Sequence, residues 1–233
     1  MGPPLRRTNI AAVLKGALNQ EHGKECGLAI RAVVFDIGGV LEFTLRTGWE
    51  RKWEANLGLK PGELAERLHS VWKDGSIGTI SEEQVEKSTG DILGLDRAQL
   101  DTFMNDLWEE YVGTLNIEIA AYFAGLRPRY QTAILSNSFV GAREKEQDLY
   151  GFGDMCDLII YSHEEGIKKP DRAIYELLCE RLGVQPAEVV FLDDVEVHVG
   201  AAREIGIQAV LFKETTQAIA DIEACLNASK QLP

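Results

Sequence analysis

Short apolar runs recur along the chain from residue 31 onward, and most of them end at a polar residue. The runs are rich in β-branched side chains and show no alternation of apolar and polar positions. Such runs are typical of parallel strands whose two faces are both covered. The five runs occupy residues 32–35, 132–135, 158–161, 189–192 and 209–212.

Stripes of apolar residues at helical spacing separate the later runs. The clearest stripe spans residues 174–182, with Pro170 and Asp171 before it and Gly183 after it. Proline at the first turn and glycine just past the last turn are common boundaries of a helix. The alternation of strands and helices therefore predicts an α/β fold with a doubly wound parallel sheet.

One long segment, residues 44–115, breaks this alternation. It has helical patterns and no convincing strand, and it follows the first strand closely. Because ligands bind at the carboxyl edge of open α/β sheets, an insertion at this point is placed to act as a lid. Its helical signals are a stripe at Trp49, Trp53 and Leu57 and two capping boxes, Ser81 with Gln84 and Asp96 with Gln99.

The pattern predicts three parts in the chain. Residues 31–43 and 116–233 form the core domain, and residues 44–115 form a small helical cap subdomain inserted into it. Residues 1–30 form a polar N-terminal extension, which is either a loosely attached tail or a short amphipathic helix with Ile10, Val13, Leu14 and Leu18 on one face.

Charge narrows the classes of partner. The chain of 233 residues has 24 Lys and Arg against 37 Asp and Glu, which gives a net charge of −13. Such a surface repels nucleic-acid backbones and anionic lipid, so we expect no nucleic acid and no membrane as partners. An anionic substrate would need a local positive group or a metal ion.

Cysteine usage and hydropathy indicate the compartment. The four cysteines are scattered, without a CxxC pair, which disfavours zinc and a disulfide framework and is typical of a reducing cytosol. No apolar run approaches the roughly 18 residues that span a bilayer. We therefore expect a cytoplasmic protein.

Acidic residues stand at the ends of two of the predicted strands. Asp36 precedes Gly38 and Gly39, which allow the backbone to approach a ligand closely, although a carboxylate there would also cap a turn. Asp193 and Asp194 are adjacent, and two neighbouring carboxylates repel each other unless a cation or hydrogen-bond donors compensate. Because hard cations prefer oxygen ligands, the pair predicts a metal site.

Ser136 and Lys169 complete a set of polar residues near strand ends. Neither is informative alone, since serine often caps a helix and loop lysines are usually solvated. Taken together, the set resembles the haloacid dehalogenase-like (HAD) hydrolase superfamily, and within it the phosphatase domain of soluble epoxide hydrolases and the bacterial sugar-phosphate phosphatases. The resemblance rests on four segments in order: 35–41 (FDIGGVL), 135–137 (LSN), 168–171 (KKPD) and 191–194 (FLDD).

This resemblance implies a nucleophile and a Mg²⁺ site. Asp36 would attack phosphorus and form an aspartyl-phosphate. The protein ligands of Mg²⁺ would be Asp36, the backbone carbonyl of Gly38, and Asp194, with Asp193 as an indirect or water-mediated partner. Gly206 lies twelve residues after Asp194, which matches the superfamily's spacing from metal ligand to helix-end glycine and selects Asp194 over Asp193.

The resemblance also implies a phosphate-binding set. Ser136 would donate a hydrogen bond to the phosphoryl group, with Asn137 beside it. Lys169 would bridge the nucleophile and the phosphate, as a fixed positive charge where negative charge accumulates.

Two positions depart from the superfamily's usual pattern. Gly38 stands where active phosphatases usually carry an aspartate that acts as general acid and base. His198 stands where the relatives often carry Asn or Asp, and would either orient the metal loop or lie on the surface. If another proton donor replaces the missing aspartate, it is either a side chain, with Glu42 and His198 the nearest candidates in sequence, or water.

The leading interpretation is a Mg²⁺-dependent phosphatase of a small phosphorylated metabolite. A second is a 2-haloacid dehalogenase, whose aspartate attacks carbon without a metal; the Asp193–Asp194 pair and the lack of an aromatic residue at Gly38 argue against it. A third is a binding or regulatory protein with impaired catalysis, which Gly38 favours and the intact Asp36, Lys169 and Asp194 oppose. The sequence specifies neither the substrate nor the oligomeric state.

Overall fold

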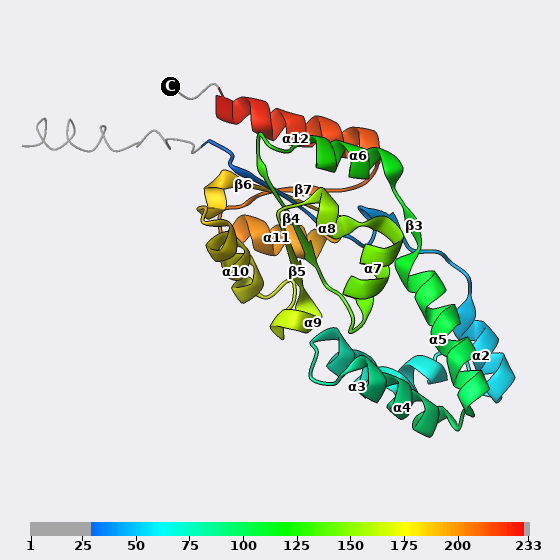
Figure 1. The fold of residues 1–233 in the computed structure, drawn as a ribbon. Helices are drawn as coiled ribbons and strands as arrows, with labels where there is room; N and C mark the ends of the chain where they lie inside the picture. The colour runs from blue at the N-terminus through cyan, green and yellow to red at the C-terminus, as the bar shows by residue number, and fades with distance from the viewer. Residues whose placement is uncertain (1–28, 231–233) are drawn as a thin grey trace, which may run out of the picture.

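A computed structural model describes residues 29–230 of the chain. Figure 1 shows a layered unit built on a sheet, with a smaller group of helices beside it. The predicted N-terminal extension, residues 1–30, lies almost entirely outside the described residues. No helix within residues 29–230 combines the length and the apolar character that crossing a bilayer requires.

The larger unit is built on a five-stranded sheet. Its strands lie in the order β5-β4-β1-β6-β7, and every neighbouring pair is parallel. The predicted α/β fold is confirmed, and each apolar run is a strand to within one residue at either end. The strands are β1 (Ala32–Phe35), β4 (Gln131–Ser136), β5 (Leu158–Tyr161), β6 (Val189–Asp193) and β7 (Gln208–Leu211).

Helices cover both faces of this sheet. Val33 and Phe35 of β1 pack on one face with residues of α6 and α12, whereas Ala32 and Val34 pack on the other face with residues of α10 and α11. Because both faces are buried, the strands show no alternation of polar and apolar residues. The covering helices are α6 (Ile117–Gly125), α12 (Thr215–Lys230), α10 (Arg172–Leu182) and α11 (Glu196–Glu204). Shorter elements join them: α7 (Ala142–Tyr150), α8 (Phe152–Met155), α9 (Ser162–Glu165) and the 3₁₀ turn η1 (Pro186–Glu188).

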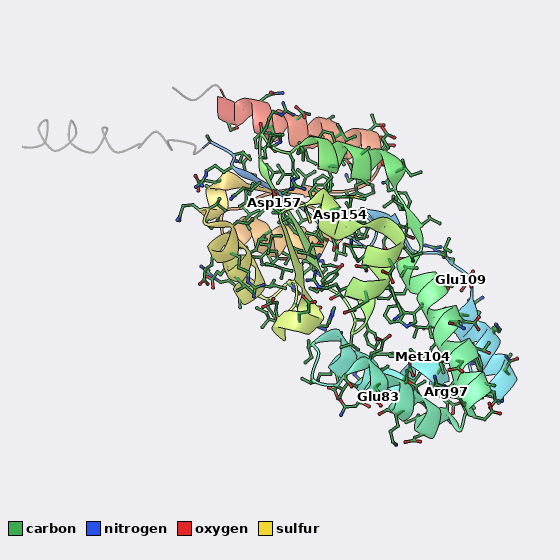
Figure 2. The ribbon with its side chains drawn as sticks, viewed as in Figure 1. Glu83, Arg97, Met104, Glu109, Asp154 and Asp157 are labelled. Carbon is green, nitrogen blue, oxygen red and sulfur yellow. The ribbon has the colours of Figure 1, made fainter. Side chains whose placement is uncertain are left out.

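The smaller unit consists of four helices between the first and second strands of the main sheet. They are α2 (Trp49–Leu57), α3 (Glu63–Ser76), α4 (Glu82–Leu93) and α5 (Arg97–Val112). Both predicted capping boxes are present, at the starts of α4 and α5. Figure 2 shows Met104 on α5, which is buried among the apolar residues of this unit, together with the exposed Glu83, Arg97 and Glu109. The four helices therefore have a hydrophobic core of their own.

A two-stranded antiparallel ribbon, β2 (Glu42–Phe43) with β3 (Thr114–Leu115), connects the two units. The sequence did not predict this ribbon, because strands of two residues are too short to show a periodic pattern. Gly113 precedes β3 with φ +58°, and a Cβ there would lie 2.1 Å from the Phe43 carbonyl oxygen. Only glycine fits so close an approach of two backbones.

The four-helix unit also contacts the larger unit at a second place, the carboxyl end of α3. The Val140 N–H donates to the Gly75 carbonyl at 3.2 Å, and Ser162 Oγ donates to the Ser76 carbonyl at 2.9 Å. Gly78 has φ +67°, and a Cβ on it would lie 1.8 Å from the His163 carbonyl oxygen. The helices are thus held at the ribbon and at the end of α3.

Candidate functional site

The candidate site lies at the carboxyl edge of the sheet, between β1 and β6. The chain passes from β1 to β4 and β5 on one side and then to β6 and β7 on the other, so the strand order reverses at this point. Ligands of open α/β sheets bind at such a switch point. Asp36 directly follows β1, and Asp193 is the last residue of β6. The topology therefore brings together two carboxylates that are distant in the sequence.

Lys169 connects these two carboxylates. Its Nζ lies 2.8 Å from Asp36 Oδ1 and 2.7 Å from Asp193 Oδ2, and it donates to the Leu135 carbonyl at 2.9 Å. An ammonium group has three donors, and all three have partners here. Because the Lys169 side chain is fully buried, removing either it or a carboxylate would leave an uncompensated buried charge.

Burial and pairing move the pKa values of the two carboxyls in opposite directions. Burial raises the pKa of Asp36, and the Lys169 charge offsets this rise only in part. Burial also acts to raise the pKa of Asp193, but hydrogen bonds from His198 and Lys169 outweigh it and hold that pKa below its usual range. His198 Nδ1 lies 3.1 Å from Asp193 Oδ1, and the ring is largely buried. The structure thus places His198 against Asp193 and not on the open surface.

Asn137 fixes the backbone of Lys169. Its Nδ2 donates to the Lys169 carbonyl at 2.8 Å, and its Oδ1 accepts from the Lys169 N–H at 2.8 Å. Both ends of the Asn137 amide are therefore engaged in positioning the lysine. Ser136, buried at the end of β4, makes only a long contact of 3.5 Å to the Asn137 carbonyl, so its hydroxyl has no strong partner.

Asp194 faces a cavity of about 610 Å³ that Asp36 and Gly38 also line. The Asp194 carboxylate lies against Gly39, where a Cβ would come within 2.2 Å of Asp194 Oδ2. Two carboxylates and the peptide oxygen of Gly38 make an all-oxygen donor set, which fits a hard divalent cation. Positions 38 and 39 are both glycine, so this turn of the chain adds no side chain to the place.

Asp193, the other acidic ligand candidate from this strand end, already has partners within the protein. Ligand atoms of Asp36, Asp193 and His198 lie within 4.8 Å of one another. However, Asp193 pairs with Lys169, hydrogen-bonds His198 and accepts from the Val195 N–H at 2.8 Å. Asp194 is therefore better placed than Asp193 to offer its carboxylate to a cation.

A second cavity, of about 140 Å³, lies beside the first and contains two buried acids, of which the sequence suggests only Glu42, as a candidate proton donor. Glu42 of β2 and Glu146 of α7 line it together with Gly38 and Ser136. Burial, with the nearby Glu146 and Asp36 charges, raises the pKa of Glu42 to about 9. Burial raises the pKa of Glu146 to about 7, although the Tyr161 hydroxyl donates to this carboxyl.

The sequence carries little signal for these two acids. Glu42 is a proton-donor candidate only because it lies near Gly38 in the sequence. Glu146 lies on α7, whose sequence is mostly polar, so the sequence does not distinguish this buried glutamate from the exposed ones. The two side chains line one cavity because the ribbon and α7, which are far apart in the sequence, lie close together in the fold.

A third cavity, of about 250 Å³, lies between the helical unit and the sheet unit. It is mainly aromatic, and it shares Thr44 and Glu110 with the first cavity and Thr44 and Tyr111 with the second. Three adjoining spaces thus surround the carboxyl edge of β1. The remaining residues of the aromatic cavity are Trp49, Trp72, Leu107 and Phe139.

The comparisons identify the family. Residues 30–206 match the family model described as haloacid dehalogenase-like hydrolase, and the chain belongs to this family. Pig bifunctional epoxide hydrolase 2 is 29% identical over 217 residues, which cover 84% of this chain and 39% of that protein. This chain therefore spans about two-fifths of that relative's length. A Mycobacterium tuberculosis phosphatase is 28% identical over 200 residues, covering 82% of this chain and 90% of that protein.

Solved structures show the same fold. An HAD-family enzyme from Bacteroides thetaiotaomicron, crystallised with magnesium and inorganic phosphate, superposes with a TM-score of 0.70 at 21% identity. The match covers 82% of this chain and 99% of that one. The chain is accordingly a hydrolase-family protein with an HAD core.

Proposed function

We propose that this protein is a Mg²⁺-dependent phosphatase that hydrolyses a small phosphorylated metabolite through an aspartyl-phosphate. The observation that supports it most is the difference between two adjacent aspartates. Lys169 and His198 contact the Asp193 carboxylate, whereas Asp194 lines the same cavity as Asp36. Relatives include phosphatases, and the Bacteroides neighbour was crystallised with magnesium and phosphate.

The first chemical step uses Asp36. Its carboxylate attacks phosphorus, a P–O bond forms to Asp36, and the bond to the alcohol oxygen breaks. The alcohol leaves after it gains a proton from water or a nearby acid. Lys169, 2.8 Å from Asp36, orients the carboxylate and supplies positive charge where the phosphoryl oxygens become more negative.

Water then attacks the phosphorus of the acyl phosphate, the P–O bond to Asp36 breaks, and inorganic phosphate leaves. Ser136 is placed to donate to a phosphoryl oxygen, since its hydroxyl lacks a strong partner within the protein. Asn137 acts through Lys169, whose backbone it holds. When bound by Asp36, Asp194 and the Gly38 carbonyl, Mg²⁺ would neutralise the repulsion between phosphate and carboxylate.

Phosphate release tests the proposal. We expect wild-type protein to hydrolyse p-nitrophenyl phosphate with Mg²⁺ and to lose this activity with EDTA. Asp36→Asn should reduce the rate by about a thousandfold or more, because the amide keeps the shape but cannot attack. Asp148→Asn, an exposed aspartate on α7, is the matched control. An Asp36→Asn rate within tenfold of wild type would remove Asp36 from the mechanism.

A further inference from the structure

Glu42 presents a buried oxygen atom without a partner. Its side chain lies in the second cavity, the residue is only 2% exposed, and Oε2 makes no hydrogen bond in the protein. A buried carboxyl oxygen without a donor keeps the cost of losing its water and gains no hydrogen bond in return. Because the cavity is large enough for several non-hydrogen atoms, a ligand group with hydrogen-bond donors can supply the missing partner.

The ionisable groups that line or adjoin this cavity are mainly acidic. Glu146 and Asp36 both act electrostatically on Glu42, and both make its negative charge less favourable. The cations nearby are engaged elsewhere: Lys169 pairs with Asp36 and Asp193, and Arg143 pairs with Glu164 at 2.6 Å while also attracting Glu146. A positive group entering the cavity would favour the ionised forms of Glu42 and Glu146, and it would supply Glu42 with the partner that its Oε2 lacks.

The second cavity is also within reach of a phosphoryl group at Asp36. It shares Gly38 and Asn137 with the cavity that Asp36 and Asp194 line, and Ser136 lies in its wall. A group in the second cavity would thus be separated by only a few bonds from a phosphate held by Lys169 and Ser136.

We propose that the Glu42–Glu146 cavity binds a primary ammonium group of the substrate, so that this protein acts on phosphate monoesters of short amino alcohols. The inference rests on the proposed phosphatase function and adds a substrate class to it. An ammonium has three donors, which match Glu42 Oε2, the Glu146 carboxylate and a hydroxyl such as that of Thr44. The opposite charges of such a substrate match the cationic and anionic halves of the site.

A second metal ion is a poorer fit to this cavity. Within residues 29–230, the only group of three ligating side chains with atoms within 4.8 Å of one another is Asp36, Asp193 and His198, and neither Glu42 nor Glu146 belongs to it. Two carboxyl groups in a cavity of about 140 Å³ suit a small group that donates hydrogen bonds.

Four esters test the substrate class on wild-type protein: 2-aminoethyl, 2-hydroxyethyl and n-propyl phosphate, with p-nitrophenyl phosphate as a reference. We expect kcat/KM for the amino ester to exceed that of both other alkyl esters by at least tenfold, mainly through KM. Equal values for the amino and propyl esters, or for the amino and hydroxyl esters, would overturn the inference. Failure to hydrolyse any ester, including the aryl reference, would instead contradict the proposed phosphatase function.

A variant and a binding measurement locate the effect. Glu42→Gln should reduce the ratio of amino ester to propyl ester at least tenfold, whereas Glu118→Gln, an exposed glutamate on α6, should leave the ratio unchanged. Calorimetry adds a readout without turnover: 2-aminoethylphosphonate should bind wild-type protein at least tenfold more tightly than propylphosphonate. Equal affinities for the two phosphonates would contradict the proposal even if Glu42→Gln fails to fold.

Discussion

At the scale of single residues, the two neighbouring aspartates at the end of β6 differ in their surroundings. Asp193 is buried and engaged by Lys169 and His198, and Asp194 faces the cavity. We predict that Asp194→Asn weakens the Mg²⁺ dependence of activity at least tenfold with little change in melting temperature. Asp193→Asn should lower the melting temperature by about 5 °C or more, because it leaves buried Lys169 short of one partner.

Mg²⁺ titrations of activity and thermal melts of both variants measure this difference. The reverse order, with Asp193→Asn affecting Mg²⁺ and Asp194→Asn affecting stability, would mean that the metal-ligand assignment is displaced by one residue.

Gly38 leaves open space where an acid could stand. A Cβ built on Gly38 meets nothing within 4 Å, and Gly38 is not among the glycines with positive φ, unlike Gly39. Gly38→Asp should therefore fold without backbone strain. A placed acid contributes roughly 10²–10⁴-fold when the leaving group needs a proton, so we predict a larger gain on alkyl than on aryl phosphates.

The ratio of alkyl to aryl turnover, measured on folded Gly38→Asp and wild-type protein, checks this prediction. An unchanged ratio would indicate that another group, or water, already protonates the leaving alcohol.

Titration of the buried acids Glu42 and Glu146 should make the stability of the fold depend on pH. Their pKa values in the fold, about 9 and about 7, lie above the ordinary glutamate value, so between pH 4.5 and 9 the folded state binds more protons than the unfolded state. Stability is then greatest at the acidic end and is lost as pH rises through the folded pKa values. We expect the melting temperature in EDTA to fall by about 5 °C or more between pH 5.5 and 9.

Glu42→Gln should flatten this pH dependence, because the amide does not titrate, and the exposed Glu118→Gln should not. Melting temperatures that rise steadily from pH 5.5 to 9 would contradict the assignment.

At the scale of elements, the carboxyl end of α3 fixes the helical unit to the sheet unit. Gly78, at φ +67°, lies so close to the His163 carbonyl that any side chain must displace it. Gly94 has the same φ and nothing within 4 Å of its Cβ, which makes it a matched control for backbone strain alone. We predict that Gly78→Ala lowers the melting temperature and raises KM more than Gly94→Ala does. Equal effects of the two substitutions would show that this contact does not hold the helices in place.

The sequence predicted the elements that have a strong periodic or capping signal. All five main strands, the helix ending at Gly183 and both capping boxes are present in the structure. The β2–β3 ribbon could not be predicted because strands of two residues show no period. The burial of Glu146 on α7 could not be predicted because its partner, Tyr161, comes from a different element, β5. Local pattern therefore determines elements, and tertiary contacts determine which polar residues are buried.

At the scale of the whole molecule, we propose that α2–α5 act as a lid over the site. Joining Phe43 to Thr114 through a short turn would remove the helices and keep the ribbon as a hairpin. We predict a folded core that retains more activity on p-nitrophenyl phosphate than on larger esters, because remote binding energy is lost.

Phe139 and Val140 pack against the helical unit, so the shortened protein should carry polar substitutions at both positions to remain monodisperse. Circular dichroism and phosphate release compare it with the full chain carrying the same two substitutions. A shortened chain that cannot fold would show that the helices belong to the main core.

The β2–β3 ribbon also affects how the chain can reach this fold. Strand β1 pairs with β4, and the whole helical segment lies between Phe35 and its partner Ile134 in the sequence. Closing so long a loop is entropically costly, and the cost grows with the logarithm of loop length. Glu42 opposite Leu115 brings the two ends of that segment together. Once β2 and β3 have paired, the helical segment between them no longer adds to the length of the loop between β1 and β4. An early ribbon would therefore speed the assembly of the central sheet.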